Sequence, residues 1–195
     1  MAKYIFILLF HTIYSQEKFE VKNIGFSIDV PENWIILENK DVLENLNNYD
    51  LNDETKRDFF LSSNKATELV TYSKYNPEQY KGIIPTIKIR IKELKSDYYV
   101  DFLKFVEESN LKVKEQLHNF SYIEKPKIIT ISNREVVQFS TLFSMFQNKK
   151  EFTIIAYSYY ILKEGYYISI NFIEEYKKED NYHLFQNLIH SVELK

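Results

Sequence analysis

Residues 128–173 constrain the fold more than any other part of this sequence. Four apolar segments are separated here by three short turn sequences: Asn133-Arg134, Asn148-Lys149 and Lys163-Glu164-Gly165. Such short turns predict three consecutive β-hairpins, which together form an antiparallel meander. Apolar residues occupy both odd and even positions of these segments. Because successive side chains of a strand point to opposite faces, we expect both faces of the sheet to be buried.

Earlier segments also have the pattern of strands. They cover residues 24–30, 34–37, 68–75 and 87–91. The last alternates most clearly, with isoleucine at positions 87, 89 and 91 and a basic residue at positions 88, 90 and 92. This strand therefore has one apolar and one basic face. We expect the basic face to be solvated or covered by acidic groups.

Two segments have the periodicity of amphipathic helices. One helix is expected from a cap at Ser96 to about Asn119, and another from Asp180 onward. Their apolar positions predict the side chains that face the core: Tyr99, Phe102, Leu103, Val106, Val113 and Leu117, then Leu184, Phe185, Leu188 and Ile189. Shorter helices are expected to start at Asp41 and at Asn52 or Asp53.

A sheet that is buried on both faces needs helices on both sides. The sequence therefore predicts an α+β fold, an antiparallel β-sheet flanked by helices in an α/β/α sandwich. A short strand at 191–194 is expected to close the chain.

The first fifteen residues have the layout of a secretory signal peptide. Lys3 is the sole charge before Glu17, and an apolar run covers positions 4–10. The small residue Ser15 follows a more polar stretch, so we expect cleavage between Ser15 and Gln16, or directly after Gln16. The run is shorter than the ~20 apolar residues of a membrane-spanning helix. The alternative is a buried N-terminal strand.

The composition predicts a single domain over residues 16–195. Of 195 residues, 45% are hydrophobic and 27% are charged, which is typical of a globular chain. Cysteine is absent, which excludes disulfides, thiolate metal sites and the lipid-bearing cysteine of bacterial lipoproteins. The net charge of −3 indicates no strongly basic surface, so we expect no nucleic-acid partner. With no second apolar run of membrane length, we expect no stable membrane insertion of the mature chain.

Two local features resemble the PsbP-like family. In the segment at 25–34, Gly25 leads a strand, Pro31 lies in a turn and Trp34 follows it. The end of the chain, at 188–194, is similar to the closing helix and short strand of that family. The resemblance implies an α/β/α sandwich over about residues 19–195, with Trp34 packed in the core. Members are mostly non-catalytic binders, and the resemblance implies no particular site residue.

No arrangement of residues predicts a catalytic, cofactor or metal site. His183 and His190 are seven residues apart on the last expected helix, ~10 Å along its axis, which is too far to chelate one metal. We expect both at the surface, and His118 at a helix end. With three glycines in the chain, a glycine-rich phosphate loop is excluded.

Acidic and aromatic clusters also have simple structural interpretations. Carboxylates that flank Lys177 and Lys178 predict a solvated loop: Glu174, Glu175, Glu179 and Asp180. Asp50, Asn52 and Asp53 resemble a calcium loop only loosely. Three tyrosines on neighbouring strands form either an exposed aromatic platform or, as we favour, part of the core beneath a helix: Tyr157, Tyr159 and Tyr167.

These patterns favour an exported, non-catalytic binding or accessory protein of the bacterial cell envelope, located in the periplasm or outside the cell. An abundance of residues with AT-rich codons, such as Asn, Ile, Lys and Tyr, is consistent with a bacterial source. The partner would be an unknown protein or small molecule. The alternatives are a hydrolase with a dispersed site, and a secreted immunity or chaperone-like protein.

Overall fold

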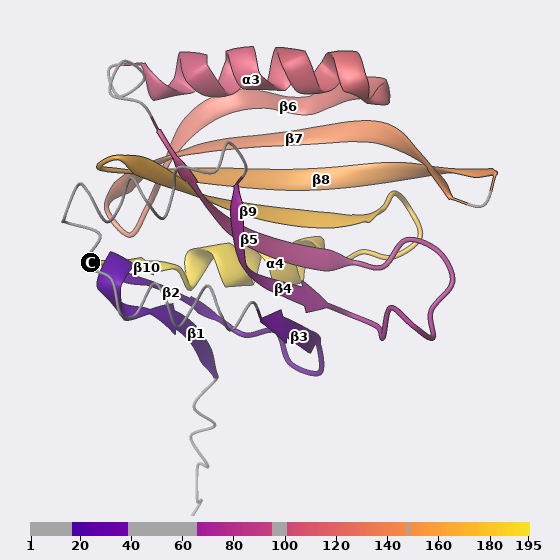
Figure 1. Cartoon of the computed structure of the whole chain (residues 1–195), viewed down its shortest axis with the longest axis horizontal. Helices are drawn as coiled ribbons and strands as arrows, with labels where there is room; N and C mark the ends of the chain where they lie inside the picture. Colours follow the sequence, from indigo (N-terminus) through magenta and orange to yellow (C-terminus); the bar gives the residue numbers. More distant parts are fainter. Residues whose placement is uncertain (1–16, 39–65, 95–100, 148) are drawn as a thin grey trace, which may run out of the picture.

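The computed structural model describes residues 17–38, 66–94, 101–147 and 149–195 (Figure 1). Within them, seven strands form one antiparallel sheet in the order β3-β4-β5-β9-β8-β7-β6. The strands are β3 (Ile35–Glu38), β4 (Thr67–Ser73), β5 (Thr86–Glu93), β6 (His118–Ile131), β7 (Arg134–Gln147), β8 (Lys150–Lys163) and β9 (Tyr166–Glu175). The meander from β6 to β9 confirms the three predicted hairpins.

The turn between β6 and β7 shows how the sequence fixes this meander. Ser132 and Asn133 have φ values of 47° and 59°. Two consecutive residues with positive φ make the turn whose twist matches that of the flanking strands. The Ser132 hydroxyl also donates a hydrogen bond to the carbonyl oxygen of Val192, which joins this turn to the end of the chain.

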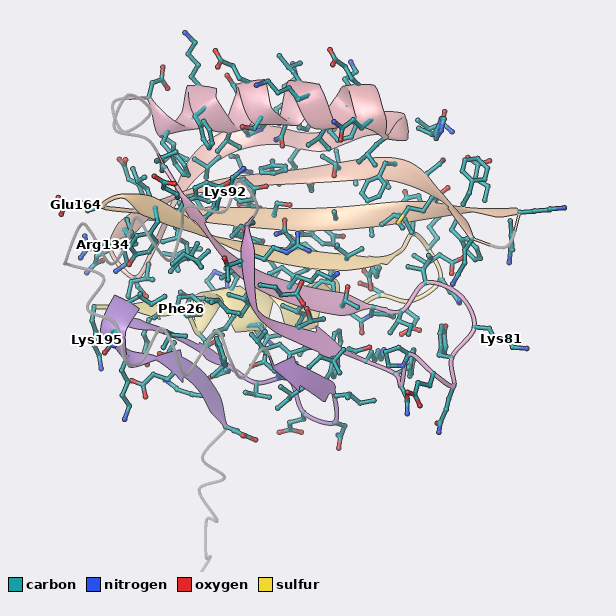
Figure 2. The ribbon with its side chains drawn as sticks, viewed as in Figure 1. Phe26, Lys81, Lys92, Arg134, Glu164 and Lys195 are labelled. Carbon is teal, nitrogen blue, oxygen red and sulfur yellow. The ribbon has the colours of Figure 1, made fainter. Side chains whose placement is uncertain are left out.

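A small second sheet joins the two ends of the described chain. Its order is β1-β2-β10, with β1 (Lys18–Val21), β2 (Phe26–Asp29) and β10 (Glu193–Leu194). The backbone N–H of Lys195 donates to the carbonyl oxygen of Gly25 at 2.8 Å, and Phe26 and Lys195 lie on the same side of the molecule (Figure 2). The strand predicted at 24–30 begins later, because the short 3₁₀ helix η1 (Lys22–Ile24) precedes Gly25.

Helix α4 (Tyr182–His190) covers one face of the large sheet. Three side chains of α4 are buried: Phe185, Leu188 and Ile189. They belong to the same hydrophobic cluster as the three isoleucines of β5 and the buried side chains of β1 and β2. The Trp34 ring packs edge-on against Phe185, with ring centroids 6.3 Å apart. Trp34 therefore contacts the core, as the family resemblance implies.

Helix α3 (Phe102–Gln116) packs against the opposite face. Phe102 and Val106 contact a second buried cluster that includes Phe139 and Tyr167. Because Tyr166 belongs to the first cluster and Tyr167 to the second, adjacent residues of β9 are buried on opposite faces. In Figure 1, α3 lies along β6 and β7 near one edge of the sheet, so it covers this face only in part.

The long helix is shorter than predicted at its C-terminal end. α3 ends at Gln116, and β6 begins at His118, so His118 lies in a strand and not at a helix end. The ladder between β6 and β7 starts at this residue, and strand pairing overrides the helical periodicity of the local sequence. The helix also begins later than predicted. Its N-cap is Asp101 and not Ser96, and the Asp101 side chain accepts a hydrogen bond from the Lys104 N–H at 3.0 Å.

Several predicted features lie outside the described residues. They are the signal peptide with its cleavage at Ser15 or Gln16, the short helices from Asp41 and from Asn52 or Asp53, the position of Tyr99, and the loose calcium-loop pattern at Asp50. They stay predictions.

Candidate functional site

A cavity of about 330 Å³ lies between α3 and the face of the sheet that this helix covers in part. The register of the strands sets its floor. Asn171 of β9 stands between Lys88 of β5 and Ser158 of β8, and the Ser158 hydroxyl donates to Asn171 Oδ1 at 2.8 Å. Two residues further along the same pair of strands, Ser169 of β9 pairs with Arg90 of β5. The floor is therefore polar at the centre of the sheet.

The basic face of β5 forms one side of this cavity. Lys88, Arg90 and Lys92 all line it, and all three are partly exposed. Lys92 lies near the end of β5 that approaches α3 (Figure 2). Glu68 of β4 accepts a hydrogen bond from the Arg90 guanidinium at 3.4 Å. Burial alone would raise the pKa of Glu68, but bonding to Thr71 and the charges of Lys88 and Arg90 bring it below its usual value.

Apolar and aromatic side chains form the other side of the cavity. They come from α3, β6, β7 and β8: Val113, Leu117, Phe120, Phe139, Phe143 and Tyr160. Burial raises the pKa of Tyr160 to about 12, although the nearby charge of Arg90 lowers it. Tyr160 therefore stays neutral at physiological pH and can present an O–H group to the cavity. Val113 was predicted to be core, but it is 40% exposed.

Asn110 of α3 lines the same cavity and is 5% exposed. Its Nδ2 is buried and makes no hydrogen bond with the described part of the chain. The amide lies close enough to the Tyr122 hydroxyl to limit the rise in pKa that burial causes there, but no bond of normal length forms at Nδ2. A buried amide donor without an acceptor is costly, by about 1–3 kcal/mol. Because Nδ2 has almost no accessible surface, this donor does not face the open volume of the cavity.

The histidines lie away from this cavity. His118 is exposed and packs its ring edge-on against Phe146, with centroids 5.6 Å apart. His183 and His190 are exposed on α4, as expected, and the His190 Nδ1 lies 2.7 Å from the Gln186 carbonyl oxygen. None of the three lines either of the two cavities described in this chain. Among the described residues, no three His, Cys, Asp or Glu side chains gather closely enough to hold a metal ion.

The acidic segment after β9 is not the fully solvated loop that its sequence predicts. Glu174 is 3% exposed, and its carboxylate accepts hydrogen bonds from the Asn181 side chain at 2.7 Å and the Asn181 backbone N–H at 3.3 Å. Glu179 forms a salt bridge with Lys74 and accepts a hydrogen bond from the Tyr75 hydroxyl. These contacts attach the start of α4 to the sheet, so the carboxylates have a structural role.

The three tyrosines do not form one platform. Tyr157 and Tyr159 face α4, where Tyr157 packs against Phe185 and the Tyr159 hydroxyl accepts a hydrogen bond from Gln186. Tyr167 lies on the opposite face and packs against Phe102 of α3. Each tyrosine is thus covered by a helix, as favoured, but by two different helices.

Sequence reasoning found the basic face of β5 but not the cavity. Asn110, Ser158, Ser169 and Asn171 gave no recognisable motif because they are far apart along the chain and meet only through sheet register and helix packing. One usable signal was present. The polar residues at positions 158, 169 and 171 interrupt otherwise apolar strands, and buried polar residues at such positions need partners.

This arrangement of a large antiparallel sheet with a helix against each face defines a class of α+β proteins, the PsbP-like fold, and the chain has that fold. It is similar to the solution structure of cyanobacterial PsbP (CyanoP) from Synechocystis sp. PCC 6803, with 12% identity, a TM-score of 0.54 and 94% of each chain covered. It is also similar to LpqN of Mycobacterium tuberculosis, a protein involved in cell envelope biogenesis, with 14% identity and a TM-score of 0.51 over 86% of this chain and 83% of that one.

Identities this low establish a shared fold and not a shared activity. No protein-family model matches the chain, and no curated protein matches it either. Among the described residues, no helix has the length and hydrophobicity needed to cross a membrane.

Proposed function

We propose that this protein is an exported, non-catalytic binding protein of the bacterial envelope, and that the cavity beneath α3 is its ligand site. The observation that carries the proposal is this cavity of about 330 Å³, which has a polar floor, an apolar wall and the basic side chains of β5 on its other side. Its size is at the lower end of the ~300–1,000 Å³ of small-molecule sites. A small molecule therefore fits this cavity.

The fold and the N-terminal sequence support the cellular setting. LpqN, which shares the fold, is described as involved in cell envelope biogenesis. The basic, apolar and small-residue regions of the first fifteen residues are those of an export signal. The proposal assigns the mature protein to residues 16–195, in the periplasm or outside the cell.

Export is tested by N-terminal sequencing of the protein recovered from the periplasm and the medium. We expect a first residue of Gln16 or Glu17. An intact Met1 on protein found only inside the cell would contradict the export part of the proposal.

Binding is tested by NMR of isotope-labelled mature protein, titrated with small neutral, cationic and anionic amphiphiles. We expect at least one class to shift the amide signals of cavity residues on α3, β8 and β9 more than those of the exposed residues of β1. If all three classes leave the cavity signals unchanged, the cavity is not a ligand site and this part of the proposal fails.

A further inference from the structure

The cavity beneath α3 has a surplus of positive charge among the described residues. Three cationic side chains of β5 line it, and Glu68 is the carboxylate that pairs with this row, through Arg90. One carboxylate opposite three cations leaves a positive potential on this side. Because the cavity wall has a low dielectric constant, such a row attracts an anion more strongly than the same charges would in bulk water.

The groups that face the cavity near this row are mainly hydrogen-bond donors. Lysine and arginine side chains have no acceptor atom. The Asn171 Oδ1 already accepts the Ser158 hydroxyl. A ligand that satisfies these groups must bring acceptor oxygens, as a carboxylate, sulfate or phosphate does.

The remaining wall requires an apolar body. Phe120, Phe139 and Phe143 line the cavity together with aliphatic residues at the C-terminal end of α3. A fully hydrated ion such as free phosphate would leave this wall in contact with water. Burial of an apolar chain or ring on it is favourable by about 25 cal/mol per Å². A cavity of about 330 Å³ has room for a short apolar chain or one or two rings.

We propose that the ligand of this cavity is a small amphiphilic anion, whose acidic head lies on the basic row of β5 and whose apolar body lies on the phenylalanines. This inference rests on the proposed binding function and names the class of ligand that the function requires. A neutral amphiphile would leave the surplus charge uncompensated, and an amphiphilic cation would be repelled by it.

The first experiment compares three probes that share an eight-carbon body: octanoate, 1-octanol and octylammonium, each titrated calorimetrically into the mature protein at pH 7. We expect octanoate to bind at least tenfold more tightly than 1-octanol, and octylammonium to bind most weakly. Octanoate affinity should also fall as salt is raised, because ions screen its contact with partly exposed cations. Equal affinity for octanoate and 1-octanol would overturn the assignment of an anion.

The second experiment locates the head group with substitutions. Arg90→Gln and Lys92→Gln, at partly exposed positions that should tolerate the change, should each weaken octanoate about tenfold. Matched controls at exposed positions, Lys112→Gln on α3 and Lys125→Gln on β6, should leave the affinity unchanged.

The outcomes separate this inference from the proposed function. Binding of 1-octanol or octylammonium in the cavity, with no preference for octanoate, would retain the binding function and overturn the ligand class. Octanoate binding that is insensitive to Arg90→Gln and Lys92→Gln would also overturn it, since the head group would then lie elsewhere. Failure of all three probes to bind would count against the binding function itself.

Discussion

Glu174 shows how much the behaviour of one residue depends on what covers it. Its carboxyl group lies under the start of α4, where burial raises its pKa although hydrogen bonds from Asn181 oppose the rise. Asn110 is a comparable case on the other face of the sheet, because its amide is buried but lacks an acceptor. Both residues look like ordinary surface residues in the sequence, and their roles follow from tertiary packing.

The raised pKa of Glu174 predicts a pH dependence of stability. As pH rises above the usual pKa of 4.5, the Glu174 carboxyl group stays protonated to a higher pH in the folded state than in the unfolded state. The contribution of Glu174 to stability is therefore complete below 4.5 and is lost as pH rises through its folded-state pKa. Glu174→Gln keeps an oxygen that accepts from Asn181 and removes the buried charge. We therefore expect the melting temperature of the variant, relative to the unmodified protein, to increase from pH 4.5 to pH 7.5.

The measurement is thermal unfolding followed by circular dichroism across this pH range. The lowered pKa of Glu68 affects both proteins equally and cancels in the difference. The charge of Glu179 helps to raise the pKa of Glu174, so its coupling to Glu174 is part of the measured effect. Glu164→Gln, at an exposed turn position labelled in Figure 2, is the control and should show a flat difference. A flat difference for Glu174→Gln as well would contradict the assigned role.

At the scale of secondary-structure elements, strong local sequence patterns predicted which strands exist. Pairing with neighbouring strands decided where those strands begin and end. The hairpins from β6 to β9 and the strand β5 follow from alternation and turn residues alone. The first part of β6 was missed, because Pro126 and charged residues make residues 118–127 a poor strand sequence. β6 is an edge strand, and its register with β7 shifts between Glu124 and Lys127, which is where a proline without an N–H is tolerated.

Helix α3 depends on its N-cap. Asp101→Ala removes the acceptor of the Lys104 N–H, so we expect unfolding free energy to fall by about 0.5–2 kcal/mol. Asp101→Asn retains a good capping group and should cost much less. Urea unfolding of the two variants measures the difference, and equal losses would show that the cap has no role beyond the charge of Asp101.

The small sheet depends on the close approach of Gly25 to the chain end. Gly25 has a φ of 59°, and a Cβ at this position would lie 2.7 Å from the Lys195 carbonyl oxygen. We expect Gly25→Ala to destabilise the protein by more than about 1 kcal/mol in urea unfolding. In a chain without Lys195 the same substitution should cost less, since only the backbone strain remains. An unchanged cost there would rule out the contact as a cause.

At the scale of the whole molecule, two buried clusters of unequal size lie on the two faces of one sheet. The larger joins α4, β1, β2 and the inner strands, and the smaller lies beneath α3. The thinner packing beneath α3 leaves room for the cavity. The face with the larger cluster therefore supports the fold, and the other face carries the candidate site.

This division predicts unequal effects of core truncation. Phe185 is fully buried between Trp34, Tyr157 and Phe172, so Phe185→Ala should cost about 3–5 kcal/mol. Phe102→Ala should cost less, because Phe102 is 8% exposed at the edge of the smaller cluster. Chemical denaturation of both variants checks the order, and a larger loss for Phe102→Ala would contradict the division.

The sequence by itself determined the antiparallel meander, the burial of both faces and the basic face of β5, because alternation and turn residues are local properties of the chain. It also identified the resemblance to PsbP-like proteins, which the shared fold confirms. The second sheet, the start of β6, the buried state of Glu174 and the cavity at Asn110 were decided only by the tertiary structure. Each depends on contacts between residues distant in the chain, and the burial of a polar group is fixed only when those contacts form.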